Sequence, residues 1–140
     1  MHTSAGGVAH NVALAASYAS SCPVRLVTAL GTDPEGAWLR EYAQVVGLDV
    51  AFIAGGSGTA RYVALHDKDG ELVTAAADMG IITEFRDEDI HREIKRAHPK
   101  FLAFDGNISA RTVNTIFESV KPETKGTLST SFSPHCSSSC

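Results

Sequence analysis

The sequence is poor in the features that mark secreted, membrane-spanning and nucleic-acid-binding proteins. It has only three cysteines, two of them within the last five residues, so a disulfide framework is not expected. No apolar run approaches the ~20 residues that a membrane-spanning helix needs. The start, MHTSAGG, lacks the basic and then apolar pattern of a secretory signal. We therefore expect a cytoplasmic protein that does not enter a membrane.

Positive charge is also scarce. The formal net charge is −4, and the 12 lysines and arginines are scattered, which disfavours a nucleic-acid partner because no basic stripe could neutralise phosphates. The densest basic group, within residues 89–100, is interleaved with acidic side chains and favours a solvated helix face. The length of 140 residues and a hydrophobic share of 44% suit one domain with a packed core.

Segments with the hydrophobic spacing of helices alternate along the chain with short apolar runs typical of strands. Helical spacing predicts helices over 5–20, from Pro34 to a stop at Gly47, 87–98 and 108–121. Apolar runs predict buried strands over 23–30, 48–54 and 101–105, and a hairpin formed by 59–67 and 71–78. Buried strands that alternate with amphipathic helices form layered sheets. We therefore predict an α/β fold, with a mostly parallel sheet flanked by helices and the hairpin standing apart from that sheet.

The last two helices carry clear apolar stripes. The expected inward-facing residues are Ile90, Ile94 and Ala97 in the third helix, and Val113, Ile116, Phe117 and Val120 in the fourth.

The segment AGGVAHNVALAAS, residues 5–17, places two glycines and an asparagine at the start of a helix. Gly6 and Gly7 have no side chains, so a ligand can approach the main-chain N–H groups there. Asn11 lies one turn further on, and its amide offers both a donor and an acceptor, which suits a hydroxyl group. The motif indicates either a site for a polar small molecule or an ordinary helix start after a glycine loop.

A second candidate site follows the strand at 101–105. Asp105, Gly106 and Asn107 come directly after it, at the carboxyl end where ligands gather in open α/β sheets. Asp105 and Asn107 are therefore candidate binding residues. The segment GTDPEG, residues 31–36, instead favours a helix cap at Asp33 and a tight turn.

Several segments, in the same order, resemble the N-terminal half of the PfkB (ribokinase-like) carbohydrate kinases. They are GGVAHNVALAAS, VRLVTALGTDPEG, GLDV and SGTARYVALHDKDGELVTAAADM. The sequence of the hairpin segment and the later segment FLAFDGNIS most resemble the pseudouridine kinase branch. The resemblance covers roughly residues 4–121.

The resemblance implies a partial ribokinase-like fold, with a substrate-binding half over residues 1–127 and a β-hairpin lid at about 48–79. It implies transfer of the γ-phosphoryl group of ATP, with Mg²⁺, to a ribosyl hydroxymethyl such as the 5′-hydroxyl of pseudouridine. Ribose and adenosine are alternative substrates. In many members the lid also pairs two subunits, which makes a homodimer an expectation here.

The resemblance also assigns roles in substrate binding. Gly6, Gly7 and Asn11 would hold the sugar hydroxyls. Asp105 or Asn107, at the end of a strand, would touch the substrate. Arg61 and Tyr62 of the lid would cover the base. An outward-facing, solvated Arg61 is the equal alternative.

The departures from the family pattern point to a fragment. The first strand and the Gly-Ala-Gly-Asp-like turn of the family's nucleotide site are not found, nor is a Gly-x-x-x-x-Gly-Lys-Ser/Thr loop. We therefore expect part of a substrate site, no ATP site, no catalytic residue, and a chain that is inactive alone. A second hypothesis is a non-catalytic module that pairs through its lid with an intact kinase.

The serine-rich segment 128–140 is expected to be a divergent tail. Its His135, Cys136 and Cys140 are a weak metal signal without a second cluster, so no metal is predicted. A strand over 127–132 is an alternative for the start of this tail.

Overall fold

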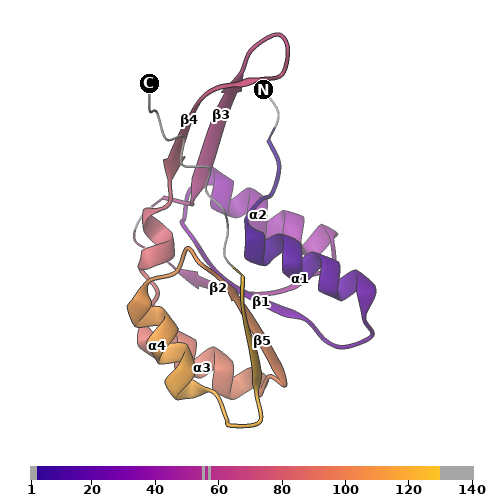
Figure 1. Ribbon diagram of the computed structural model, residues 1–140, viewed down its shortest axis with the longest axis vertical. Helices are drawn as coiled ribbons and strands as arrows, with labels where there is room; N and C mark the ends of the chain where they lie inside the picture. The colour runs from indigo at the N-terminus through magenta and orange to yellow at the C-terminus, as the bar shows by residue number, and fades with distance from the viewer. Residues whose placement is uncertain (1–2, 55, 57, 130–140) are drawn as a thin grey trace, which may run out of the picture.

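The computed structural model describes residues 3–54, 56 and 58–129. Along the chain the elements are α1 (Val8–Ala19), β1 (Arg25–Leu30), α2 (Pro34–Val45), β2 (Asp49–Ala54), β3 (Arg61–His66), β4 (Leu72–Asp78), the 3-10 helix η1 (Gly80–Thr83), α3 (Asp87–Ala97), β5 (Phe101–Asp105), α4 (Ala110–Ser119) and β6 (Lys125–Ser129) (Figure 1). The predicted α/β class is confirmed.

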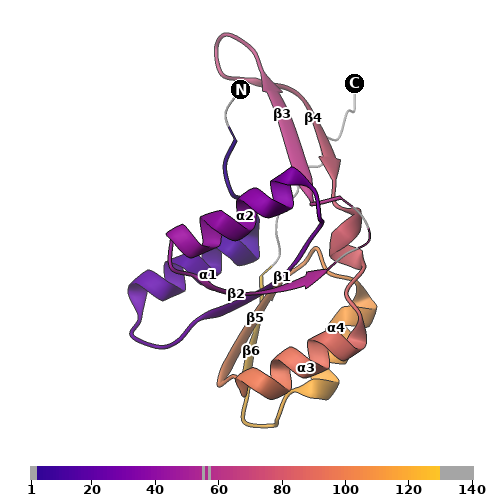
Figure 2. The same cartoon turned by 180° about the vertical axis from the view of Figure 1, so that it is seen from behind.

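Strands pair in three separate couples among the described residues. β1 runs parallel to β2, with Arg25 opposite Asp49, and β5 runs parallel to β6. β3 and β4 form an antiparallel hairpin that stands apart from the parallel pairs, as predicted. Figures 1 and 2 show this hairpin rising from one end of a body in which α1 and α2 lie to one side of β1 and β2, and α3 and α4 to the other.

The two faces of β1 supply two hydrophobic cores. Leu26 packs with Ala13 of α1 and with Leu48. The next residue, Val27, points to the opposite face because side chains alternate along a strand. There it joins a cluster centred on Ile53, Ile90 and Ile116, which unites β2 with α3 and α4. Helices therefore cover both faces of the parallel strands, the usual arrangement for buried parallel sheets.

The inward stripes of the last two helices are narrower than predicted. Ile90 and Ile116 are buried as expected, but Ala97 is exposed, which is a correction. α3 ends at Ala97, where His98 adopts a left-handed cap, so no following turn covers that position. Phe117 is also wrong as a core residue, with 61% of its surface exposed. It instead contacts Phe104 edge-on, at 6.1 Å between ring centroids.

The start of the predicted tail is partly a strand. β6 begins at Lys125, two residues before the alternative strand start, and its register places Lys125 opposite Phe101 and Ser129 opposite Asp105. Residues 130–140, with His135, Cys136 and Cys140, lie outside the described residues.

Gly36, in the first turn of α2, occupies a closed site. A Cβ atom there would overlap the carbonyl oxygen of Gly31 and lie 2.8 Å from Oγ1 of Thr59. The Gly31 atom belongs to the backbone, and Thr59 is buried, with 2% of its surface exposed. Neither neighbour can therefore move away easily. Only glycine therefore lets α2 start this close to the segment before the hairpin.

Replacing Gly36 with alanine is expected to lower the free energy of unfolding by about 1–3 kcal/mol, the usual cost of overpacking a closed site. Gly126→Ala is the matched control, because its added methyl group would meet nothing within 4 Å. Urea unfolding of both variants measures the difference. Equal losses of stability would contradict the close approach at Gly36.

Candidate functional site

The start of α1 is open to solvent and has unpaired main-chain donors. Gly7 is the N-cap residue, with φ 104°, a conformation that favours glycine, and it gives no side-chain cap. A Cβ on Gly6 would meet nothing within 4 Å, and both glycines are exposed. The first helical hydrogen bond is donated by the N–H of Asn11 to the carbonyl of Gly7, at 3.0 Å. The N–H groups before it therefore have no helical partner.

One of these donors faces the end of β5. The N–H of Ala9 donates to Oδ2 of Asp105 over 3.4 Å, although 96 residues separate them along the chain. The other carboxylate oxygen, Oδ1, accepts the N–H of Asn107 at 3.0 Å. The tertiary structure thus brings the glycine start of α1, Asp105 and the Asn107 loop to one place. Since 3.4 Å is long for a hydrogen bond, both groups could exchange this contact for a better one.

Asn11 and His10 lie on the first turn of α1. Asn11 is exposed, and its Oδ1 is 3.2 Å from Nδ1 of His10. If Nδ1 donates in this contact, Nε2 of the neutral ring is an acceptor. Nε2 is buried and has no hydrogen-bond partner in the described part of the chain. The His10 ring also contacts Tyr42 of α2, at 5.8 Å between centroids.

Sequence reasoning overlooked His10. The only signal was its position, as a polar residue between the glycine pair and Asn11 in an otherwise apolar helix. A buried nitrogen without a partner costs stability, about 1–3 kcal/mol for a typical polar group. Its place beside the open helix start makes His10 a further candidate residue of this site.

The two lid candidates lie elsewhere. Arg61, the first residue of β3, pairs with Glu35 of α2 at 3.2 Å and stands opposite Asp78 in the hairpin register. Tyr62 is 57% exposed. In the residues that the structure describes, no hydrogen bond or ion pair links either side chain to the start of α1 or to Asp105.

Asp33 ties the base of the hairpin to the body. Its Oδ1 caps α2 by accepting the N–H of Gly36 at 2.9 Å, as the sequence predicts for a cap residue. The same carboxylate accepts the hydroxyl of Thr59 at 2.5 Å and the N–H of Thr59 at 2.7 Å. Oγ1 of Thr59 in turn accepts the N–H of Gly31 at 3.1 Å. These contacts fix residue 59, two positions before β3 begins.

The hydrogen bonds to Asp33 favour its charged form. The bond from the Thr59 hydroxyl contributes most, followed by the N–H groups of Thr59 and Gly36, and together they lower the pKa of Asp33 to about 2. Besides capping α2, Asp33 thus holds Thr59, which lies 26 positions further along the chain. No local sequence pattern indicates this contact.

Metal and membrane signals are weak in the described ranges. No group of three or more His, Cys, Asp or Glu residues there could hold a metal ion. Every described helix is too short or too polar to cross a bilayer.

Comparisons with known proteins agree on one family. A family model described as pfkB family carbohydrate kinase matches residues 1–137. A pseudouridine-metabolizing bifunctional protein of Schizosaccharomyces pombe is 36% identical over 107 residues, which are 74% of this chain and 14% of that protein.

Solved structures show the same likeness. A carbohydrate kinase from Agrobacterium tumefaciens is 26% identical with a TM-score of 0.65, over 77% of this chain and 36% of that one. A ribokinase from Giardia lamblia has a TM-score of 0.73 at 16% identity, over 95% and 42%, which shows the fold alone. The chain thus spans less than half the length of each of these relatives.

The depressed pKa of Asp33 predicts an acid-sensitive part of the stability. Because the folded-state pKa, about 2, lies below the ordinary 3.8, the unfolded chain takes up the proton first. The contribution of Asp33 is therefore complete above about pH 4 and is lost as the pH falls towards about 2. In Asp33→Asn and Thr59→Ala the free energy of unfolding should fall less steeply over this range than in the wild type.

Urea unfolding at several acidic pH values provides the measurement. Thr74→Ala, which changes an exposed threonine of β4, is the control and should keep the wild-type slope. Identical slopes in all four proteins would contradict the role given to the Asp33 carboxylate.

Proposed function

Because the chain belongs to the pfkB family of carbohydrate kinases, we propose that it carries the sugar-binding half of a kinase for a ribosyl compound, with pseudouridine as the favoured substrate. The observation that supports this most is the meeting of the open α1 start with the carboxylate of Asp105. Both belong to segments that resemble the family, and each offers hydrogen bonds suited to hydroxyl groups.

The charges at the site favour a neutral polyol over a phosphate. A bare helix start attracts anions, since it carries about half a positive unit charge. Here Asp105 already supplies a negative charge within contact of the Ala9 N–H, so a second anion would be repelled. A sugar hydroxyl can donate to Asp105 and accept from a main-chain N–H at once. The exposed amide of Asn11 offers the same two capacities one turn away.

The pseudouridine preference is supported by the relative from Schizosaccharomyces pombe, whose name gives pseudouridine metabolism and which is 36% identical over 107 residues. Tyr62 of the hairpin presents an exposed ring that could stack on a base, and Arg61 lies beside it on β3. In this proposal Gly6, Gly7, Asn11 and Asp105 hold the ribose, and Asn107 borders it.

We place phosphoryl transfer outside these residues. The family uses ATP and Mg²⁺, and such transfer needs a phosphate cradle and a group that takes the hydroxyl proton. The sequence contains no Gly-Ala-Gly-Asp-like turn and no Gly-x-x-x-x-Gly-Lys-Ser/Thr loop. The proposed role of this chain is therefore to bind and orient the sugar.

Ligand-induced stabilisation tests the sugar site. Pseudouridine should raise the melting temperature of the chain by mass action, and more than ribose or adenosine does. Gly6→Ala should leave the unliganded melting temperature unchanged, because the methyl group enters open space, yet weaken binding about tenfold by blocking access to the N–H groups. Asp105→Asn should also weaken binding.

Gly126→Ala is the control and should bind as the wild type does. If none of the three compounds raises the melting temperature, the sugar site is refuted. Stabilisation by ribose but not by pseudouridine would overturn the substrate preference.

A turnover assay tests whether this chain binds the sugar without transferring a phosphoryl group. Incubated with ATP, Mg²⁺ and pseudouridine, the chain should bind pseudouridine without forming a phosphorylated product, measured by mass spectrometry. Product formation that Asp105→Asn abolishes would show that the catalytic groups are present in these residues after all.

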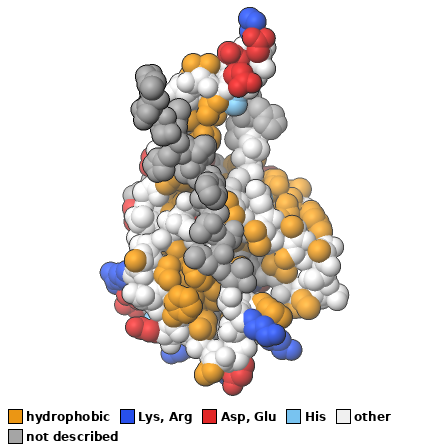
Figure 3. Space-filling model, viewed as in Figure 1, with side chains coloured by type: hydrophobic (Ala, Val, Ile, Leu, Met, Phe, Trp, Pro, Cys, Tyr) orange, Lys and Arg blue, Asp and Glu red, His pale blue; other side chains and the backbone are white. Residues whose placement is uncertain are grey.

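The exposed hairpin supports a second proposal, in which two copies of the chain pair through β3 and β4. Val63 and Leu65 lie on one face, 45% and 59% exposed, and Tyr62 and Leu72 on the other, 57% and 48% exposed. Figure 3 shows hydrophobic side chains along this hairpin. An isolated two-stranded hairpin is only marginally stable in water, so a partner that covers it would stabilise it.

Sedimentation of the purified chain should then report a dimer that Leu65→Lys or Tyr62→Lys dissociates. Phe117→Lys, at an exposed apolar residue of α4, is the control and should leave the dimer intact. A monomeric wild type would contradict pairing between copies, and a complex formed only with an intact kinase would favour the module hypothesis.

A further inference from the structure

Ion pairs are unevenly distributed over the basic residues. Among the described residues, they engage six of the 12 lysines and arginines: Arg25, Arg61, Lys68, Arg86, Arg92 and Arg111. Arg40 and Lys125 instead lie over aromatic rings, Arg40 over Phe52 and Lys125 over Phe101. The other four have no carboxylate partner in the described residues and lie at or just after the ends of α3 and α4, as Lys95, Arg96, Lys100 and Lys121.

The acidic residues of α3 do not neutralise this group. Asp89 is paired with Arg86 and Arg92, and Glu93 with Arg25. The sequence shows these charges interleaved, which suggests a balanced, solvated face. In the structure Asp87, Asp89 and Glu93 of α3 already have arginine partners, and none of them pairs with the basic residues at the end of the helix.

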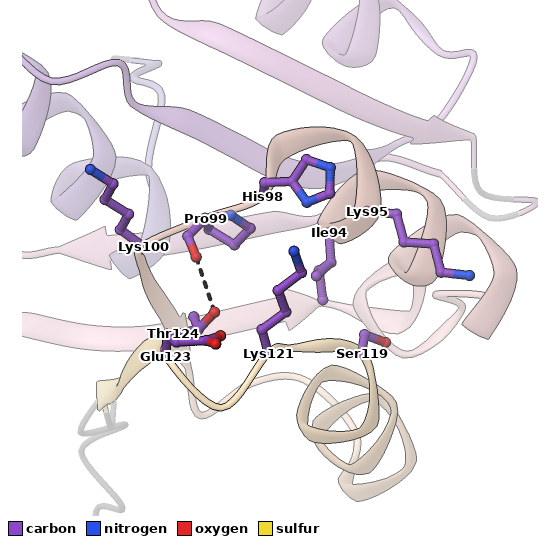
Figure 4. A pocket seen from close by; sticks show the side chains of 9 residues that line it. All are labelled: Ile94, Lys95, His98, Pro99, Lys100, Ser119, Lys121, Glu123 and Thr124. Atoms are coloured by element: carbon purple, nitrogen blue, oxygen red, sulfur yellow. Dashed lines mark hydrogen bonds between the residues drawn. The ribbon is translucent and has the colours of Figure 1, made fainter.

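The segments that carry these unpaired lysines, at the end of α3 and just after α4, meet around a groove of about 330 Å³. Its lining residues are Ile94, Lys95, His98, Pro99, Lys100, Ser119, Lys121, Glu123 and Thr124. Figure 4 shows the ammonium group of Lys121 pointing across the groove towards the ring of His98, while Lys95 and Lys100 lie to either side with their ammonium groups directed outward. The hydroxyl of Thr124 donates to the carbonyl of Pro99 at 3.0 Å and closes one wall.

The groove carries a net positive charge. Three lysines line it, against one carboxylate, Glu123. The ends of α3 and α4 also lie here, and each adds about half a negative unit charge. With these helix ends included, the balance of the lining charges stays positive. An anion is therefore the complementary ligand, and its size is limited because the volume lies at the lower end of the range for small-molecule sites, about 300–1,000 Å³.

We propose that this groove, lined by Lys95, His98, Lys100 and Lys121, is a binding site for a small phosphate-bearing anion. It is separate from the sugar site. The groove adjoins the start of β5, whereas Asp105 is its last residue, and the four residue steps between them span about 13 Å at about 3.3 Å per residue. The lysines provide mobile point charges, and the ring of His98 provides a hydrogen-bonding group.

Titration of the ¹⁵N-labelled full chain with sodium diphosphate, at constant ionic strength, tests the proposal. The amide signals of His98, Lys100, Lys121 and Thr124 should shift and saturate. Glycerol phosphate and orthophosphate, titrated separately, distinguish a phosphate ester from the free ion as the preferred ligand. Raising the salt concentration should weaken binding, because exposed charges are screened beyond about 8 Å at 0.15 M ionic strength.

The double variant Lys95→Gln, Lys121→Gln should bind diphosphate at least about tenfold more weakly, because it loses two of the three lysine charges that line the groove. Lys68→Gln, at the exposed hairpin tip, is the matched control and should bind normally. Lys121→Gln alone, at an exposed residue, decides the matter if the double variant does not fold. Shifts that do not saturate, equal binding of sulfate, or unchanged affinity in the lysine variants would each overturn the proposal.

Discussion

The burial of β1 on both faces is the constraint on which the rest of the structure depends. Leu26 packs against α1 and Val27 against the cluster of Ile53, Ile90 and Ile116. Because adjacent residues of a strand point in opposite directions, these two contacts place α1 on one side of the sheet and α3 with α4 on the other. The order of the layers follows from this one strand, and the candidate site lies where they meet.

That arrangement explains how a site forms from distant segments. α1 contacts both β1 and β5, and this brings the N–H of Ala9 to the carboxylate at the end of β5. The glycines before α1 leave the approach open, whereas an ordinary capping side chain would occupy it. The combination of a bare helix start and a nearby carboxylate favours a hydroxyl compound, which is the chemistry expected of a sugar site in the pfkB family.

The hairpin and the basic groove are two separate surfaces of different chemistry. The hairpin is held at its base by Asp33 and Thr59, while its strands expose apolar side chains. Its tip is acidic, with Asp67, Asp69 and Glu71 around a single lysine, and the groove by the end of α3 is basic. This separation of charge is hidden by the overall net charge of −4.

The sequence was sufficient to predict the four helices, the strands β1 to β5, their order and the family, whereas η1 was not predicted and β6 only as an alternative over 127–132. Apolar periods, the Asp33-Pro34 cap and the turn glycines act through neighbouring residues, so they can be recognised locally. It also indicated Gly6, Gly7, Asn11 and Asp105 as separate candidates. It did not indicate the exposure of Phe117, because a stripe shows which residues are apolar but not how wide a face its neighbours cover.

By itself, then, the sequence determined which segments become helices and strands, and it supplied an open helix start and a carboxylate at a strand end. Only the tertiary structure decided which of these groups meet. Three features bring together residues that are far apart in the chain. They are the contact of Ala9 with Asp105, the hydrogen bonds between Asp33 and Thr59, and the groove in which Lys121 lies near His98. Such contacts depend on how the layers pack, and packing is a property of the whole fold.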